Sequence, residues 1–172
     1  MNLTQTVPRS PYEALGGIVF LPRAIDKMRA HLAGTKGEYN SHFGTSERLL
    51  RVLFGLTAEE FEGIVREHPT DDGVLDALRR RMPLSAQDIE DWNEIAIFGG
   101  PLTEEDWTLH WQRLEASGHD HRREIVTQFD RLDLDEGREV PVGGRRAQFA
   151  RKRALTLVDR IRERRRCAGT DT

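Results

Sequence analysis

Hydrophobic residues recur along most of the chain at intervals of three and four positions, which is the spacing of an α-helix that buries one face. The first such stripe consists of Leu21, Ile25, Met28 and Leu32. Pro22 suits the first turn of a helix, and Gly34 is a typical helix end. The pattern therefore predicts a helix from Pro22, followed by a loop over residues 35–44.

The same spacing predicts further helices over about 46–54, from Thr57, over 72–82, from Ser85 to Phe98, from Thr103 to Gly118, and over 121–131. Thr57 and Glu60 have the spacing of a capping box, in which each side chain caps the backbone of the other. Strand character is confined to 18–20 and 140–142. We predict a mostly α fold, a single irregular bundle of about six to eight short helices, whose core contains Leu32, Leu53, Phe61, Leu78, Trp92, Trp107 and Trp111.

Composition supports a globular domain with a charged surface. The 172 residues are 37% hydrophobic and 32% charged, a length typical of one domain. Cys167 is the only cysteine, so no internal disulfide is expected and a reducing cytoplasm is the expected location. The apolar run 14–21 is too short to span a bilayer and contains two glycines.

Charge is distributed unevenly, although the net charge is only -3. Residues 143–172 hold ten Lys or Arg and three Asp or Glu, whereas the preceding 142 residues hold sixteen and twenty-six. We therefore expect a helical domain over 1–142 and a basic helical extension over 143–172, in which alanines and aliphatic residues form one stripe of an Arg-rich amphipathic helix.

This C-terminal helix has three alternative roles: docking on the acidic body, pairing with a protein partner or a second copy to give a homodimer, and binding nucleic acid. Its candidate contact residues are Arg145, Arg146, Lys152, Arg153, Arg160 and Arg164. The acidic body and the isoelectric point of about 6.1 make nucleic acid the weaker alternative. Membrane binding is not expected, because small alanines dominate the stripe.

The segment from the first helix into its loop holds the best candidate ligand site. Arg23 and Lys27 lie one turn apart with Asp26 beside them, and Glu38 and Tyr39 follow in the loop. Together these side chains could recognise a small anion. The alternative is that they pair with one another, with Arg23 bonded to Asp26 or Glu38, and hold the loop against the helix.

No cofactor or metal is predicted. His119 and His121 could contact a divalent ion, but a tight zinc site needs three or four ligands, and the other histidines show no recognised spacing. Residues 130–139 lack the ligand pattern of a calcium loop and are predicted to form a half-buried turn. No nucleophile motif or phosphate-binding glycine loop occurs.

Three longer motifs resemble a bacterial family, the one catalogued as domain of unknown function 5069. They are PRSPYEALGG at 8–17, LPRAIDKMRAHLAGTKGEY at 21–39 and FDRLDLDEGR at 129–138, and the tryptophan-bearing middle of the chain supports the same resemblance. The resemblance covers about residues 3–140 and implies a small helical protein without implying a reaction. Members tend to continue with a Tyr-Asn-Cys-Pro-like run, whereas this chain has Phe43 where that cysteine would fall, so thiol chemistry is not expected.

These observations favour a binding or protein-interaction module over an enzyme. A small-anion binder or an enzyme that uses residues 23–39 is the alternative, and nucleic-acid binding through the C-terminal helix is a second one.

Overall fold

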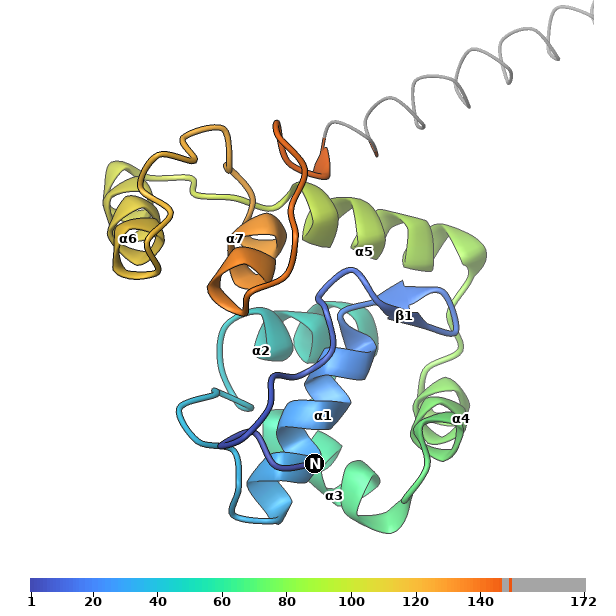
Figure 1. The fold of residues 1–172 in the computed structure, drawn as a ribbon. Coiled ribbons are helices and arrows are strands. Elements are labelled where there is room, and N and C mark those ends of the chain that lie inside the picture. The colour runs from blue at the N-terminus through green and yellow to red at the C-terminus, as the bar shows by residue number, and fades with distance from the viewer. Residues whose placement is uncertain (147–148, 150–172) are drawn as a thin grey trace, which may run out of the picture.

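The computed structural model describes residues 1–146 and 149 (Figure 1). Within these residues the chain forms seven α-helices and one two-stranded sheet, which confirms the mostly α, irregular bundle. The strands are β1 (Ala14–Leu15) and β2 (Ile18–Val19). The helices are α1 (Leu21–Leu32), α2 (Thr45–Leu49), α3 (Ala58–Glu67), α4 (Asp71–Arg81), α5 (Ala86–Phe98), α6 (Glu104–Ala116) and α7 (Gln128–Asp135), and a π-helical turn, η1 (Leu50–Phe54), extends α2.

Side-chain caps define the starts of several helices as the sequence predicts. Thr57 and Glu60 form the expected capping box of α3, and Ser85 and Thr103 begin equivalent boxes at α5 and α6. Each box satisfies backbone N–H groups that have no partner inside the helix. These short polar motifs therefore fix the helix boundaries more sharply than hydrophobic spacing does.

The hairpin β1–β2 is attached to α5. Gly16 and Gly17, with φ of 59° and 87°, form its turn in a region that other residues rarely occupy. The Trp92 indole N–H donates to the carbonyl of Val19, and the Asn93 amide accepts from the N–H of Val19 and donates to the carbonyl of Gly17 in the turn. The strand predicted near residue 18 is thereby confirmed.

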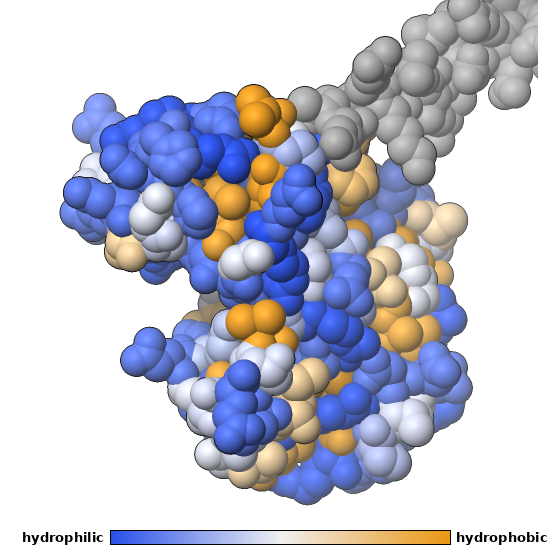
Figure 2. All heavy atoms as spheres, in the orientation of Figure 1, coloured by the Kyte–Doolittle hydropathy of each residue, from blue (hydrophilic) through white to orange (hydrophobic). Residues whose placement is uncertain are grey.

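The main core surrounds α1, which lies in the middle of the molecule with α3, α4 and α5 around it (Figure 1). Four of the predicted anchors are buried there, namely Leu53, Phe61, Leu78 and Trp92. Leu32 is only half-buried, because it lies at the end of α1. Polar side chains cover most of the face shown in Figure 2, with apolar atoms in smaller patches.

The prediction of a buried position is wrong for Trp107 and Trp111, which are half-buried. Their helix, α6, lies at the edge of the molecule (Figure 1) and contributes Leu114 to a small second cluster with Ile125, Leu134 and Val140. The two indole rings stack on each other with centroids 5.2 Å apart. They therefore cover each other in place of a larger core.

Two local predictions near the C-terminal end of the body are also wrong. Residues 121–126 form turns, and α7 begins only at Gln128, where the side chain of Thr127 accepts from the N–H of Asp130. The predicted half-buried turn over 130–139 is therefore mostly helix. The β character of 140–142 gives no strand, because the carbonyls of Val140 and Pro141 accept from Arg122.

The basic extension begins on the body itself. The Phe149 ring stacks on that of Tyr12 with centroids 5.5 Å apart, and Gly144 is buried against Asp130. The predicted Arg-rich helix otherwise lies outside the described residues. In the part of the chain that the structure describes, no helix has the length and apolar character needed to cross a membrane.

Candidate ligand-binding site

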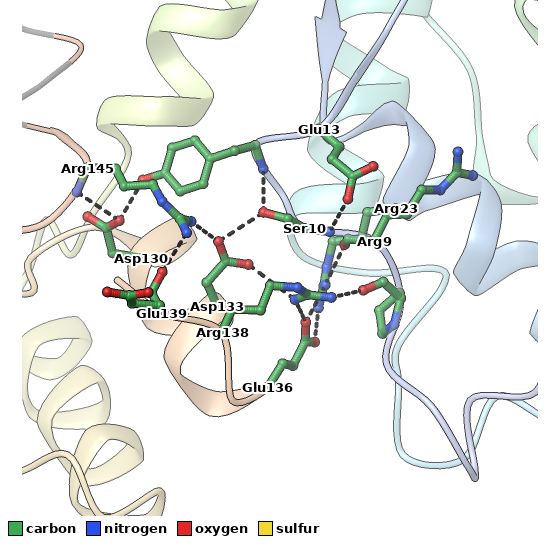
Figure 3. A network of polar contacts seen from close by, with 12 residues as sticks. Arg9, Ser10, Glu13, Arg23, Asp130, Asp133, Glu136, Arg138, Glu139 and Arg145 are labelled. Carbon is green, nitrogen blue, oxygen red and sulfur yellow. Dashed lines mark hydrogen bonds and ion pairs between the residues drawn. The ribbon is translucent and has the colours of Figure 1, made fainter. Parts of the chain in front are cut away.

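Three segments that are distant in sequence meet in one network of buried charges (Figure 3). The lead-in 8–12 supplies Arg9, α1 supplies Arg23, and the segment from α7 to residue 145 supplies most of the carboxylates. Each segment carries one of the three motifs singled out in the sequence. Side-chain contacts between charged and polar groups thus hold these three segments together, although the segments lie far apart in the sequence.

Arg23 lies at the centre of this network and is 2% exposed. Its Nη1 donates to Oε2 of Glu136 at 2.8 Å, its Nη2 donates to Oε1, and Nη1 also donates to the carbonyl of Arg9 at 3.0 Å. The prediction that Asp26 or Glu38 would be its partner is wrong. The actual partner lies just after α7, beyond the reach of any rule based on helical spacing.

Asp26 instead pairs with Arg9 of the lead-in. The backbone N–H and Nε of Arg9 donate to Oδ2 at 2.9 Å each, and Nη2 donates to Oδ1 at 2.7 Å. Arg9 continues to Asp71 at the start of α4, which also accepts from Arg29 at 2.6 Å. Hydrogen bonds to Asp26 and Asp71 raise the pKa of Arg9 despite its partial burial. This chain of ion pairs joins the lead-in, α1 and α4.

Asp133 on α7 is completely buried and has three partners. It accepts from Ser10 Oγ at 2.9 Å and from Arg138 at 3.2 Å, and it forms an ion pair with Arg145. Arg138 also contacts Glu136 and donates to the carbonyl of Pro8. A buried carboxylate that is paired in this way avoids the cost of an isolated charge.

Asp130, one turn earlier on α7, is also buried. It accepts from the Tyr12 hydroxyl at 2.9 Å and from the backbone N–H of Arg145 at 3.1 Å. Burial and the nearby carboxylate raise the pKa of Tyr12, so its hydroxyl stays a donor. The lead-in and the start of the basic extension therefore meet on α7.

Lys27 connects the network to the loop after α1. Its Nζ donates to the carbonyl of Asn40 at 2.7 Å and lies 5.2 Å from the centroid of the Phe20 ring. Burial, together with the charge of Arg23, lowers the pKa of Lys27 to about 7, although Glu136 opposes the shift. The hydrogen bond from Lys27 to Asn40 holds the loop after α1 against the helix.

The two predicted loop residues differ in position. The Arg23 guanidinium lies 5.8 Å from the centroid of the Tyr39 ring, and burial, with Glu136 nearby, raises the pKa of Tyr39 to about 12. Glu38 is exposed. The structure therefore brings Arg23, Lys27 and Tyr39 together around Glu136, and a ligand role for the predicted set stays a prediction.

The other predicted contact residues fall into two groups. Arg145 is engaged within the chain, because besides Asp133 it donates to the carbonyl of Glu139 at 2.6 Å, whereas Arg146 is exposed with its guanidinium 5.8 Å from the Phe98 ring centroid. Outside the described residues lie Lys152, Arg153, Arg160 and Arg164. His119 and His121 have ring centroids 6.3 Å apart.

An open groove adjoins the loop that Lys27 holds, because Asn40, which accepts from Lys27, also lines the groove. Its volume is about 700 Å³, within the range of small-molecule sites, and its walls come from the loop 36–43 and from residues 47–59 of α2, η1 and α3. Phe43 in its wall is 66% exposed. An exposed aromatic ring in a concave surface is a typical contact for the apolar part of a ligand.

The charged groups of the groove are not equally available. Glu47 pairs with Arg51 at 3.2 Å, and the pKa of Glu59 is lowered by hydrogen bonds to its own backbone and to Thr57. Among the described residues Lys36 has no ion-pair partner, and Arg51 uses one of its five N–H donors. Lys36 and the remaining donors of Arg51 are therefore available to an anionic group.

The fold and the network define a small, mostly α protein whose motif residues hold its segments together. Sequence comparison gives the family: the model of the domain of unknown function (DUF5069) matches residues 5–138, and the chain belongs to that family. All three motifs that meet in the network fall within the matched residues. A comparison with curated proteins gave no match.

Sequence reasoning missed Arg9, Glu136 and Arg138 as members of the network, although all three lie in the quoted motifs. The only available signal was that each motif contains charged residues among apolar ones. Such a signal marks residues that are paired somewhere, but it does not identify the partner.

Proposed function

We propose that the protein is a binding module that takes a small molecule with an anionic group in the groove between the loop 36–43 and residues 47–59. The observation that carries this proposal is the difference in availability between the groove's charges. Glu47 is paired with Arg51, whereas Lys36 lines the groove without an ion-pair partner among the described residues, and Arg51 keeps N–H donors beyond the one bonded to Glu47. A carboxylate or phosphate would complete their hydrogen bonds.

The groove is favoured over the cluster of Arg23, Asp26 and Lys27 as the binding surface. These three side chains are 2%, 2% and 7% exposed and already have partners in the chain. A ligand that used them would first have to break buried ion pairs, which is costly. Their role in the proposal is to position the loop that forms one wall of the groove.

A thermal-shift screen with phosphate- and carboxylate-bearing small molecules tests the proposal, because a ligand of the folded state raises the melting temperature by mass action. We expect a hit whose shift is lost in Lys36→Ala and Phe43→Ala. Arg80→Ala, at an exposed position on α4 outside the groove, is the control and should keep the shift.

Arg23→Ala separates the two possible sites. If the groove binds the ligand, this variant has a lower baseline melting temperature but keeps the ligand-induced increase. A shift that requires Arg23 and does not require Lys36 would place the ligand at the buried cluster and would contradict the proposal. A screen without any hit would also count against it.

A further inference from the structure

Two histidines and a glutamate from three different segments meet beside the groove. His31 lies in the last turn of α1, His42 in the loop and Glu62 on α3. One potential ligand atom from each lies within 4.8 Å of the others. Nε2 of His31 is 3.7 Å, and Nε2 of His42 is 3.6 Å, from the same oxygen of Glu62, Oε2.

The two distances from the imidazole nitrogens to Oε2 of Glu62 are too long for hydrogen bonds but short enough for ligands of one metal ion. An N–H···O hydrogen bond spans about 2.7–3.2 Å, so neither imidazole is bonded to the carboxylate. Two ligands of a tetrahedral zinc ion, each about 2.1 Å from the metal, lie about 3.4 Å apart. Both imidazole nitrogens therefore lie at nearly this distance from Oε2 of Glu62, and all three ligand atoms lie within 4.8 Å of one another.

The surrounding contacts constrain two of the three side chains, His42 and Glu62. Ser41 is buried, and its Oγ lies 2.8 Å from Nδ1 of His42. When Nδ1–H donates to Ser41, the lone pair of Nε2 faces Glu62, and a partner of this kind is typical of metal-binding histidines. Arg66 takes the other oxygen of Glu62, Oε1, and leaves Oε2 to the imidazoles.

The two rings are packed in a way that suits a common ion. Their centroids are 4.6 Å apart at an interplanar angle of 74°, and all three residues are partly buried. An edge-to-face arrangement lets both nitrogens approach the same point without a clash between the rings. Partial burial excludes some water while leaving an entry path from solvent.

We propose that His31, His42 and Glu62 bind a divalent transition-metal ion of the Zn²⁺ type. Two imidazoles and one carboxylate suit zinc and its neighbours, whereas Mg²⁺ and Ca²⁺ prefer all-oxygen sites. Three protein ligands leave at least one coordination position open, which is the arrangement of catalytic zinc sites rather than structural ones. His42 also lines the groove, so the open position would lie close to it.

This site involves none of the residues that the sequence suggested as metal ligands. His119, His121 and the aspartates of 130–139 take no part in it. The three ligands come from a helix end, a loop and a second helix, and only the packing of α1 against α3 brings them together. The proposal is also independent of the groove's ligand, because it needs only the metal.

Titration of Zn²⁺ into the chelator-treated, full-length protein tests the site, with Cys167→Ser as the background so that the thiol does not bind the metal. At a free zinc concentration of about 100 times Kd, we expect the melting temperature to rise by roughly 5–10 °C. In His31→Gln, His42→Gln and Glu62→Gln, zinc affinity should fall about 100-fold or more and the shift should nearly vanish. Melting in chelator alone verifies that each variant is folded.

The double variant His119→Gln/His121→Gln is the matched control and should bind zinc as the wild type does. Lys36→Ala should also keep the zinc effect, which separates this test from that of the groove. The NMR signals of the His31 and His42 rings should shift with zinc, while those of His68 should not. Absence of a zinc effect in the wild type, or a full effect in the His31 or His42 variant, would overturn the proposal.

Discussion

Arg23 illustrates how a buried charge can be tolerated. Its guanidinium is almost fully enclosed, and it is held by both oxygens of Glu136 and by the carbonyl of Arg9. Burial raises the pKa of Glu136, but hydrogen bonds and charges from Arg23 and Arg138 outweigh it and hold that pKa below its usual value. The attraction between Arg23 and Glu136, together with their hydrogen bonds, offsets the free-energy cost of removing both charges from water.

Arg23→Ala should therefore lower the free energy of unfolding by about 3 kcal/mol, because it removes one partner of a buried pair. Chemical denaturation at neutral pH measures this loss. The control is Arg66→Ala, which breaks an exposed pair with Glu62 and should cost about 0.5 kcal/mol or less. The double variant Arg23→Ala/Glu136→Gln should be more stable than Arg23→Ala alone, because it also removes the buried negative charge that only Arg138 would still compensate. Equal stability of the two would contradict the explanation by an unpaired charge.

Lys27 should make stability depend on pH. Its pKa is about 7 in the folded protein, against 10.5 as the ordinary value, so between these values the unfolded state binds more protons. Stability should then rise with pH, by about 2 kcal/mol from about pH 7 to about pH 9. Lys27→Met should remove most of this rise in urea titrations at several pH values. Parallel curves for the two proteins would show that Lys27 does not titrate in this range.

At the level of single residues, the sequence predicted which side chains would lie close together, but it did not predict which of them would pair. Arg23, Lys27 and Tyr39 do lie together around Glu136. Helical spacing, however, predicts contacts only between residues three or four positions apart. It could not show that Glu136, which is 113 positions away from Arg23, completes the group.

Helices were predictable where caps and hydrophobic stripes agree. The capping box at Thr57 has its expected role, and the helix predicted over about 46–54 ends at Phe54, where Gly55 is the C-cap of η1. The prediction of a half-buried turn fails at α7, where two leucines alternate with aspartates and this alternation is interpreted as a turn. In the structure Asp130 and Asp133 face inward because arginines and hydroxyls from other segments reach them. A prediction that places polar residues at the surface therefore assigns Asp130 and Asp133 to the exposed face of α7, whereas the structure buries them.

The start of the basic extension offers a test of close packing against α7. Gly144 has φ of 74°, and a Cβ there would lie 2.6 Å from Oδ2 of Asp130. Gly144→Ala should lower stability by about 2 kcal/mol or more, from the backbone conformation and from this clash together. Its neighbour Gly143, with φ of 86°, has no atom within 4 Å of such a Cβ.

Gly143→Ala is therefore the matched control and should cost only the backbone term, about 1 kcal/mol. Thermal unfolding of the two variants side by side gives the comparison. If both variants lose the same stability, the close approach of Gly144 to Asp130 does not contribute.

At the scale of the whole molecule, the main core around α1 buries many side chains, whereas α6 at the edge buries few. Nine residues of α1 are buried, whereas α6 buries only His110 and Leu114. The small second cluster to which α6 contributes Leu114 is separate from the main core. The two parts should therefore differ in local stability.

Amide hydrogen exchange measures this difference. The slowest amides of α6 should exchange about 10-fold or more faster than the slowest amides of α1, because opening α6 exposes little apolar surface. Equal protection of the two helices would show that α6 opens only when the whole domain unfolds.

The network also has a consequence for the order in which the chain can acquire its structure during synthesis. Arg23 leaves the ribosome long before its partner Glu136, which follows 113 residues later. At about 5–20 residues per second, α1 waits roughly 6–23 seconds for the carboxylate that allows Arg23 to be buried. During this interval the first helix cannot be enclosed without an uncompensated charge. The nascent chain must therefore keep its N-terminal segment open until the last helix of the body has emerged.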